Sequence, residues 1–350
     1  MMSIQVPLLR RLKSSQGNPG DIFIAQGVEY LFESIEDIEW LYLDKFSYKD
    51  FLKEVSKSKT KNILFGGTPQ YNNYDYWCFW YDNELWSYAK EYDFKIASVA
   101  GGSGYPDPRM SPDSFTKDCL SSKKTIDLLE LRKQVGSLFT VRDPHSHALL
   151  NSVGIRNHML PCTAYWTFKK HQPASDLPGD YWVLTPSNWN AIPDKYFKDC
   201  NNKAQEALFY YTRIYNKMKE RLGKVIICFH SEKEYRYYSK CFHKSELFYS
   251  NDWLSLLSFY SKAKGILTGR LHGAVPFLGL PGRKAHLIAV DTRYSATEFF
   301  GSITKSVYSD PVEYIVDQFV SGEPTNPSDL ISFESKYNNL FSDYLELLRV

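Results

Sequence analysis

The stretch Gly265-Ile-Leu-Thr-Gly-Arg-Leu-His-Gly-Ala274 joins a short apolar run directly to the start of a helical pattern. The apolar residues predict a strand that ends at Thr268-Gly269, and a helix that begins near Arg270. Strands that lead straight into helices are the units of parallel α/β sheets, so this junction indicates the fold class. It also brings Arg270, His272 and the first N–H groups of a helix together, an arrangement that favours a bound anion.

Short apolar runs alternate with longer amphipathic segments on both sides of this junction. Such alternation is expected for repeated strand–helix–strand units and mostly parallel sheets. We predict strands at Trp40–Leu43, Asn62–Phe65, Lys95–Ala100, Leu138–Arg142, Trp182–Thr185, Lys224–Phe229, Gly265–Thr268 and His286–Val290. The helices predicted between them include Thr125–Val135, Ala204–Arg221 and Trp253–Ala263.

The 350 residues exceed the size of one ordinary core and suit two domains. A polar break at residues 169–180 is typical of an interdomain linker. We therefore expect an N-terminal Rossmann-like domain at residues 1–168 and a C-terminal one at residues 181–325, facing each other across a cleft. Residues 326–350 have helical periodicity and could cross back to brace the first domain.

The composition argues against several classes of function. The formal net charge is +2 with no block of like charge, so nothing points to a nucleic-acid partner. The six cysteines include no Cys-x-x-Cys pair, which argues against zinc and disulfide frameworks and for a reducing compartment. Residues 1–13 hold a short apolar stretch broken by Pro7 and two arginines, which fits neither a signal peptide nor a membrane span. We expect a cytoplasmic protein.

Arg270 and His272 admit two interpretations. In the functional one, the planar guanidinium of Arg270 grips a phosphate or carboxylate, and His272 moves a proton near neutral pH. In the other, Arg270 pairs with a structural carboxylate and His272 is a buried polar group with satisfied hydrogen bonds. The spacing alone does not separate the two.

A second junction of strand and helix is Phe139-Thr-Val-Arg-Asp-Pro-His-Ser-His147. Asp143, with a proline next, predicts a helix N-cap. Arg142 at the end of the strand is a second candidate contact for an anion. His145 and His147 lie two residues apart at the helix start, and we expect both on the surface. His230 ends another predicted strand, where it either lines the cleft or caps the following helix.

Three glycine-bearing turns follow predicted strands or open the chain in the first half. Glycine lets the backbone approach a ligand closely, but none of the turns fits the dinucleotide or Walker pattern in full. They are Gly17-Asn-Pro-Gly-Asp21, Gly66-Gly-Thr-Pro-Gln70 and Gly101-Gly-Ser-Gly104. Residues 71–92 are dense in aromatic rings, of which we expect most in the core and one or two from residues 71–75 on a sugar acceptor. The sequence has no Asp-x-Asp pair or His/carboxylate cluster, so we expect no catalytic metal.

Taken in chain order, these pieces resemble the polysaccharide pyruvyl transferase family. The Arg-Leu-His-Gly segment is the most specific of them, whereas the glycine turns occur in many folds. The matching segments are Asn18-Pro-Gly-Asp21, Ile63-Leu-Phe-Gly-Gly67, Val99-Ala-Gly-Gly102, Val141-Arg-Asp143 with Ser146, Pro161-Cys162 with Ala164, Arg270-Leu-His-Gly-Ala274 and Gly279-Leu-Pro281.

The resemblance implies a two-domain fold like that of GT-B glycosyltransferases. Members of the family transfer the enolpyruvyl unit of phosphoenolpyruvate to sugar hydroxyls, which makes a cyclic pyruvate ketal and releases phosphate. No cofactor is implied. The implied partners are phosphoenolpyruvate and a sugar or lipid-linked glycan acceptor, with peripheral membrane association through the acceptor as one option.

The same resemblance implies roles for individual residues. Arg270 and the N–H of Leu271 would hold the donor, Arg142 would face it, and His272 would handle a proton, with Asp21 or His230 as the second acid. The full donor-binding set is Arg142, Arg270, Leu271, Gly273, Thr268 and His230, the catalytic set is His272, Arg270 and Asp21, and the acceptor set is Asn18, Gly67, Gly102 and Tyr71. The alternatives are a nucleotide-sugar glycosyltransferase, with Glu232 or Glu234 on the ribose, and an inactive carbohydrate-binding relative.

Overall fold

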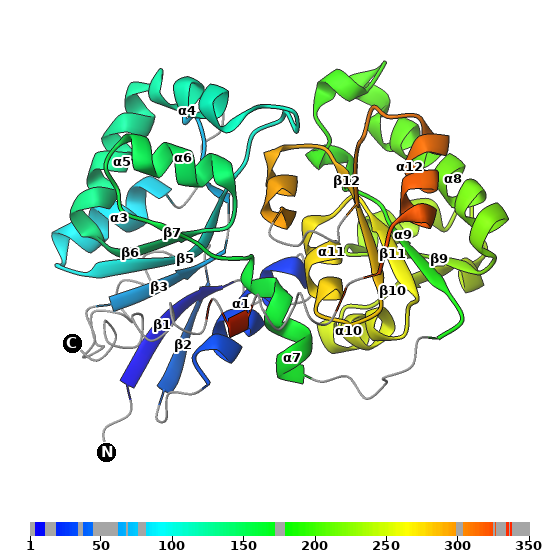
Figure 1. The fold of residues 1–350 in the computed structure, drawn as a ribbon, viewed down its shortest axis with the longest axis horizontal. Helices are drawn as coiled ribbons and strands as arrows, with labels where there is room; N and C mark the ends of the chain where they lie inside the picture. Colours follow the sequence, from blue (N-terminus) through cyan, green and yellow to red (C-terminus); the bar gives the residue numbers. More distant parts are fainter. Residues whose placement is uncertain are drawn as a thin grey trace.

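The computed structural model describes residues 4–10, 19–33, 38–44, 62–67, 69–75, 82–171, 179–298, 304–324, 326, 334–335 and 337. Two parallel sheets lie side by side, one in each half of the chain, with helix α1 (Pro19–Leu31) between them (Figure 1). Helices connect the strands, so the α/β class predicted from the alternation of strands and helices is confirmed.

The first sheet has seven strands in the order β2-β1-β3-β5-β6-β7, with β4 beside β5. Every pairing in it is parallel. The strands are β1 (Ile4–Arg10), β2 (Ile38–Asp44), β3 (Asn62–Gly66), β4 (Pro69–Tyr71), β5 (Lys95–Ser103), β6 (Gly136–Val141) and β7 (His158–Met159). The direction in which strands are added reverses between β1 and β3, and ligands of open α/β sheets bind beyond the carboxyl ends of strands at such a reversal.

The second sheet has six parallel strands in the order β10-β9-β8-β11-β12-β13, which is the doubly wound order of a Rossmann sheet. The strands are β8 (Trp182–Thr185), β9 (Val225–Phe229), β10 (Leu247–Tyr249), β11 (Gly265–Thr268), β12 (Lys284–Ala289) and β13 (Thr304–Val307). Its reversal lies between β8 and β11. The stretch that begins at Gly265 therefore forms one side of the crevice where a ligand is expected.

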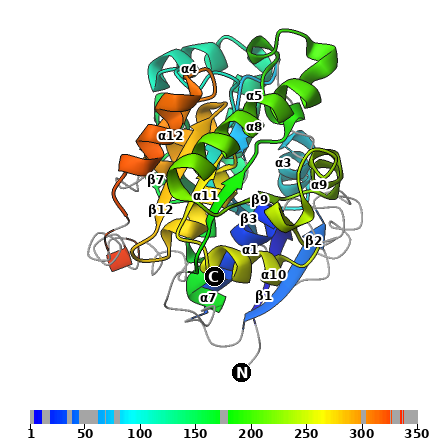
Figure 2. The same cartoon turned by 90° about the vertical axis from the view of Figure 1, so that its right-hand side faces the viewer.

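Strands β3 and β8, one from each sheet, are buried on both faces. Successive residues of a strand point to opposite faces, and the neighbours Ile63 and Leu64 of β3 accordingly enter different cores, as do Val183 and Leu184 of β8. The outer face of the first sheet is covered by α3 (Asp82–Glu91), α4 (Pro112–Leu120), α5 (Lys123–Val135) and α6 (Pro144–Ser152). That of the second sheet is covered by α8 (Lys203–Leu222), α9 (Glu232–Tyr238) and α12 (Val312–Ser321) (Figure 2). In the described part of the chain, no helix is long and apolar enough to cross a membrane.

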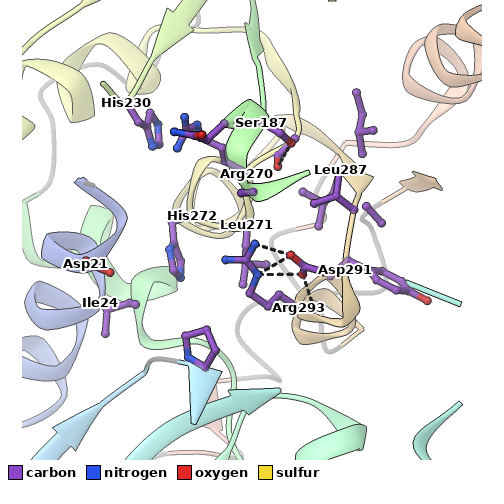
Figure 3. A pocket seen from close by; sticks show the side chains of 18 of the residues that line it. Asp21, Ile24, Ser187, His230, Arg270, Leu271, His272, Leu287, Asp291 and Arg293 are labelled. Carbon is purple, nitrogen blue, oxygen red and sulfur yellow. Dashed lines mark hydrogen bonds and ion pairs between the residues drawn. The ribbon is translucent and has the colours of Figure 1, made fainter. Parts of the chain in front are cut away.

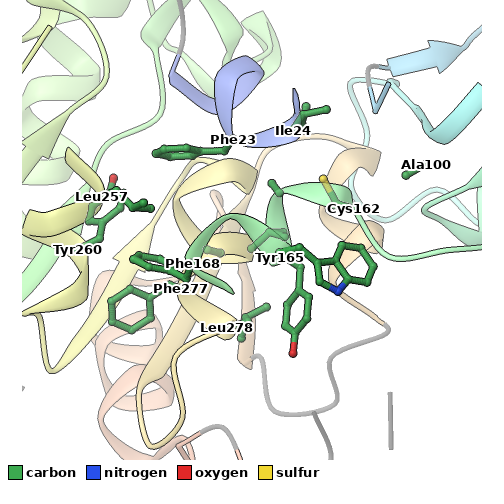
Figure 4. Packing of buried hydrophobic residues seen from close by; sticks show 14 of the residues in the cluster. Phe23, Ile24, Ala100, Cys162, Tyr165, Phe168, Leu257, Tyr260, Phe277 and Leu278 are labelled. Carbon is green, nitrogen blue, oxygen red and sulfur yellow. The ribbon is translucent and has the colours of Figure 1, made fainter. Parts of the chain in front are cut away.

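The inner faces of the two sheets share one apolar core. Helix α1 brings Phe23 and Ile24 to it, and the second domain brings Phe277 through α11 (Leu271–Leu278) and Leu257 through α10 (Trp253–Ser261) (Figure 4). Between them lie the short helices η2 (Thr163–Trp166) and α7 (Thr167–His171). The hydroxyl of Thr163 donates to the Ile24 carbonyl over 3.0 Å, which fixes α1 on η2. The two domains are thus joined by a continuous apolar layer.

The strands and helices predicted from periodicity all lie on observed elements, within a few residues at their ends. Strand β1 is missing from the strands predicted above, because Pro7 and the arginines interrupt the apolar stretch of residues 1–13. In the structure, Pro7 stands opposite Leu41 in a seven-residue parallel pairing. A proline argues against an interior strand because it donates no hydrogen bond, yet β1 pairs with β2 on one side and with β3 on the other.

Two predicted boundaries fall partly outside the described residues. The predicted linker at residues 169–180 begins inside α7, and residues 172–178 are not described. Most of the predicted C-terminal helix is not described either. Within it, Glu334 accepts a hydrogen bond of 3.1 Å from the Tyr165 hydroxyl and pairs with Lys169, and Tyr337 is buried in the shared core.

Candidate active site

A cavity of 520 Å³ lies between the two domains at the carboxyl ends of both sheets. The first domain contributes Asp21 and Ile24 of α1, Gly67 after β3 and Arg142 after β6. The second domain contributes residues that follow β8, β9, β11 and β12, among them Ser187, His230, Arg270, His272 and Asp291 (Figure 3). Residues far apart in the sequence meet here because parallel strands all end at the same edge of their sheet.

Two hydrogen bonds of Gly269 tie the turn after β11 to β8 and to the turn after β8. Gly269 N–H donates to the Thr185 carbonyl over 2.8 Å, and the Ser187 hydroxyl donates to the Gly269 carbonyl over 2.6 Å. Inside the turn, Arg270 N–H donates to the Thr268 hydroxyl over 2.9 Å. Thr268 is fully buried and does not line the cavity, so its predicted contact with the donor is wrong. Its hydroxyl shapes the turn instead.

Arg270 lines the cavity, but its charge already has a partner. One terminal nitrogen of the guanidinium lies 2.5 Å from both carboxylate oxygens of Glu234, and Nε donates to the Pro186 carbonyl over 2.9 Å. The side chains of Arg270 and Glu234 are 14% and 3% exposed. The structural interpretation of Arg270 therefore holds, because a neutralised cation attracts an anion weakly. Glu234, proposed above for a ribose, is occupied by the same pair, and Glu232 pairs with Arg236.

Arg142 is the contrasting cation. Its side chain is fully buried, and one terminal nitrogen donates to the Gly67 carbonyl over 3.0 Å and contacts the Cys162 sulfur at 3.5 Å. Nε and the other terminal nitrogen have no hydrogen-bond partner, and no carboxylate pairs with the guanidinium within the described ranges. A Cβ on Gly102 would lie 2.3 Å from Nε, so only glycine leaves room for the guanidinium. Buried charges are normally paired, and this one faces the cavity.

Two helix N-termini meet at the centre of the cavity. Helix α1 begins at Pro19 and α11 begins at Leu271, so the positive ends of both helix dipoles lie on this side of the cleft. His272 packs against Gly20, where a Cβ would lie 2.5 Å from Nδ1 of the imidazole. Asp21 and His272 both line the space between the helices (Figure 3). The paired helix ends add positive potential where Arg142 already provides charge.

His230 lines the cavity rather than capping a helix. The cap of α9 is the neighbouring Ser231, whose side chain accepts from the Glu234 N–H. Burial, followed by the positive charges of Arg270 and His272, lowers the pKa of His230 well below its ordinary value. Nε2 lies 2.6 Å from the Tyr260 hydroxyl, and Nδ1 has no partner in the residues described. His230 is therefore neutral at physiological pH and keeps one ring nitrogen for a ligand.

Sequence reasoning missed a charged pair on the second domain's wall. Asp291 and Arg293 follow β12 and both line the cavity, and Nε of Arg293 donates to the two oxygens of Asp291 over 2.9 and 2.8 Å. A strand ending near Val290 was predicted, and the search for polar residues after a strand end would have found this pair. Asn188 and Asn190 after β8 were missed for the same reason.

Several other predictions fail or lie outside the described residues. Tyr71, assigned to the acceptor side, is fully buried in the outer core with the Arg132 guanidinium 4.9 Å from its ring centre. Gly273 is buried and uses its N–H on the Arg270 carbonyl. His145, expected on the surface, is buried and lies 2.7 Å from the Met110 carbonyl. The predicted N-cap Asp143 is confirmed, because its carboxylate accepts from the Ser146 N–H at 2.8 Å.

Asn18 is outside the described residues. Gly102 does not line the cavity but packs on Arg142, whereas Gly67 and Leu271 do line it. In the described residues there is no group of three or more side chains suited to hold a metal ion.

The fold is shared with enzymes of nucleotide sugars. A putative UDP-N-acetylglucosamine 2-epimerase from Listeria monocytogenes superposes with a TM-score of 0.58 at 10% identity, over 94% of this chain and 93% of that one. The UDP-GlcNAc 2-epimerase of Methanocaldococcus jannaschii gives 0.56 at 12% identity, over 93% and 95%. An α,α-trehalose-phosphate synthase from Burkholderia xenovorans gives 0.54 at 8% identity, over 99% and 100%. At these identities the likeness establishes a GT-B fold and nothing about substrates.

The family follows from the sequence itself. Residues 18–280 match the polysaccharide pyruvyl transferase family, and the chain belongs to that family of transferases of polysaccharide biosynthesis. The match covers both the Arg142 and the Arg270 junctions. A comparison with curated proteins found no match.

Proposed function

We propose that the protein transfers the pyruvyl group of phosphoenolpyruvate to sugar hydroxyls of a polysaccharide or its precursor, forming a pyruvate ketal and releasing phosphate. The observation that carries the proposal is Arg142, a buried cation with two unsatisfied donor nitrogens that faces the interdomain cavity. An uncompensated buried charge is costly without a ligand, and a carboxylate or phosphate would offset that cost.

Phosphoenolpyruvate carries two anionic groups, and the cavity offers two places for them. The guanidinium of Arg142 suits a carboxylate or phosphate through two parallel hydrogen bonds. The N-termini of α1 and α11, with the Leu271 N–H, suit the other anion. Arg270 supports this wall through its bond to the turn after β8 rather than by gripping the donor itself.

The reaction requires proton transfers that the lining residues can supply. The methylene carbon of the donor takes a proton and becomes a methyl group, while positive charge develops at the adjacent carbon. Two sugar hydroxyls add to that carbon in turn and lose their protons, and phosphate leaves. One hydroxyl proton balances the proton added to carbon and the other goes to phosphate.

We assign the proton added to carbon to His272, which lies between the two helix ends, with Asp21 beside it on the cavity wall. His230 is held neutral, so it suits the acceptance of a hydroxyl proton rather than the role of the acid. Asp291 and Arg293 complete the opposite side of the cavity and would position the acceptor.

The direct test incubates the protein with phosphoenolpyruvate and a panel of sugars and follows phosphate release together with the mass gain of one ketal-linked pyruvate. We expect phosphate release that depends on the sugar. His272→Asn should slow it about 10²–10⁴-fold, as expected for the loss of one proton transfer. The matched control His147→Gln replaces a histidine of the first domain whose partners are Asn157 and Asn151, away from the cavity.

A parallel calorimetric titration with nucleotide sugars tests the main alternative. Binding of a nucleotide sugar without any binding of phosphoenolpyruvate would overturn the proposal and favour a glycosyltransferase. Phosphoenolpyruvate binding with no phosphate release on any sugar would favour the inactive carbohydrate-binding relative.

A further inference from the structure

A second cavity, of 560 Å³, opens beside the first on the second domain. We call it the tyrosine subsite, after Tyr196, Tyr210 and Tyr308, which line it with Lys195, Arg213 and Asp310. It lies past the carboxyl end of β13, the edge strand, and beside the start of α12. The carboxyl edge that holds the active-site cavity at β8, β11 and β12 thus continues by one strand into the tyrosine subsite.

The two cavities share their walls. The segment after β8 lines the active-site cavity with Asn188 and Asn190 and the tyrosine subsite with Lys195 and Tyr196. Tyr308 N–H donates over 3.0 Å to the carbonyl of Ala289, a residue of β12 that lines the active-site cavity. The active-site cavity and the tyrosine subsite are therefore neighbours along the carboxyl edge of the second sheet.

The first domain also reaches the rim of the tyrosine subsite. Asp107 lies 3.6 Å from Lys195, and Arg109 lies 3.2 Å from Asp310. Both belong to the loop after β5, whose Tyr105 carbonyl accepts from the Thr292 N–H over 2.9 Å at the mouth of the cleft. The subsite and the cleft are therefore parts of one interdomain surface, held by the same loop.

The floor of the subsite has the chemistry of a sugar site. The ring centres of Tyr210 and Tyr308 are 4.1 Å apart, and those of Tyr196 and Tyr308 are 5.5 Å apart. Tyrosine rings offer flat apolar faces with a polar edge, which suits the C–H face and hydroxyls of a sugar ring. The Tyr210 hydroxyl is buried and has no hydrogen-bond partner among the residues described, so it has a bond to give to a ligand hydroxyl.

The charges around the floor select the kind of sugar. Lys195 and Arg213 are matched by Asp310 and Glu313, and Arg213 lies 3.5 Å from Glu313. With equal numbers of cations and carboxylates, the subsite has no excess charge to attract a phosphate or a uronic acid. Paired charged side chains at a rim provide donors and acceptors for the hydroxyls of a neutral sugar.

We propose that the tyrosine subsite binds a neutral sugar of the acceptor glycan, in a unit of the chain other than the one that receives pyruvate in the cleft. The proposal rests on the proposed function in taking a glycan as the acceptor. It means that the enzyme acts on an oligomer or polymer and prefers it to the isolated monosaccharide.

Calorimetry without phosphoenolpyruvate tests the subsite separately from the reaction. The probes are neutral tetrasaccharides of glucose, galactose, mannose and N-acetylglucosamine, each compared with its monosaccharide. We expect at least one tetrasaccharide to bind more tightly than its monosaccharide. Tyr210→Phe should lower the affinity for that tetrasaccharide about three- to tenfold, the usual size of one hydrogen bond. It should not lower the melting temperature, because the lost hydroxyl has no hydrogen-bond partner among the described residues.

Tyr196→Ala should lower the affinity for the same tetrasaccharide further, because it removes an aromatic face. The matched control for Tyr210→Phe is Tyr92→Phe, which changes an exposed tyrosine of the first domain. Equal binding of tetrasaccharides and monosaccharides by the wild type, or an unchanged tetrasaccharide affinity in Tyr210→Phe, would overturn the proposal. These titrations contain no donor, so their result does not depend on pyruvyl transfer. An absence of pyruvyl transfer in the separate activity assay would therefore count against the proposed function and not against the tyrosine subsite.

Discussion

The two walls of the cleft each present an arginine at a junction of strand and helix, and the two arginines are in opposite states. Arg142 on the first wall is fully buried, pairs with no carboxylate in the described residues, and has two donor nitrogens without partners. Arg270 on the second wall is bound to both oxygens of Glu234. Their local sequences are alike, yet one charge is available to a ligand and the other is consumed by the fold.

This difference separates an arginine that contributes to folding from one that we expect to contribute to ligand binding. The pair of Arg270 and Glu234 stabilises the second domain and orders the turn that carries His272. If the proposed function is correct, an anionic ligand offsets the cost of burying Arg142, and we expect that residue to contribute to binding rather than to folding.

Arg270→Met should lower the free energy of unfolding by about 3–5 kcal/mol, because it leaves the buried Glu234 without its partner. Urea denaturation followed by fluorescence measures the loss. The double variant Arg270→Met/Glu234→Gln should regain much of the stability, since no charge is then left unpaired. A single variant as stable as the wild type would show that the pair does not hold the second wall.

Arg142→Met should leave the fold at least as stable in the absence of donor and weaken phosphoenolpyruvate binding by about 100-fold or more, the size of two charge-assisted hydrogen bonds. Calorimetry gives the affinity and thermal melting the stability. Arg156→Met removes an exposed arginine of the same domain and should change neither quantity. A large drop in melting temperature with intact binding would reverse the roles assigned to the two arginines.

Lowering the pH should destabilise the second domain through its buried histidine His286. Burial lowers the pKa of His286 on β12 to about 3. In the unfolded chain this histidine takes up a proton near pH 6.5. Between pH 6.5 and 3 the unfolded state therefore binds more protons than the folded state, and the free energy of unfolding decreases as the pH decreases. His286 alone should lower the free energy of unfolding by about 2 kcal/mol between pH 6.5 and 5. Denaturation across this range should show a shallower slope for His286→Gln, and parallel curves would contradict the assignment.

Gly102→Ala should have the smallest effect and act only through Arg142. The new Cβ would lie 2.3 Å from Nε of Arg142, so the guanidinium must move from its position in the structure. We expect phosphoenolpyruvate affinity to fall about tenfold, in line with the usual cost of overpacking. In the background of Arg142→Met the same substitution should have no further effect on affinity. Additive losses in the double variant would mean that Gly102 acts through another group.

Local features of the fold were predictable because they depend on neighbouring residues. The strand at Gly265–Thr268, the helix that follows it and the Asp143 cap all arise from patterns a few residues long. The strand β1 was not predictable from its own residues, because Pro7 argues against an interior strand and the partner strands β2 and β3 come later in the chain. Tyr71 was predicted to contact a sugar but lies in the core. The prediction failed because the aromatic-rich segment by itself does not show which of its rings pack against Arg132.

The sequence by itself determined the α/β class, the family and the two junctions that place Arg142, Arg270 and His272 at the carboxyl ends of strands. Those properties come from hydrophobic periodicity and short motifs, which a single chain displays in order. Only the tertiary structure decided that Glu234, thirty-six residues before Arg270 in the chain, neutralises that arginine, while two nitrogens of Arg142 have no hydrogen-bond partner in the described residues. The availability of a charge depends on every group packed around it, and those groups come from strands and helices that only folding brings together.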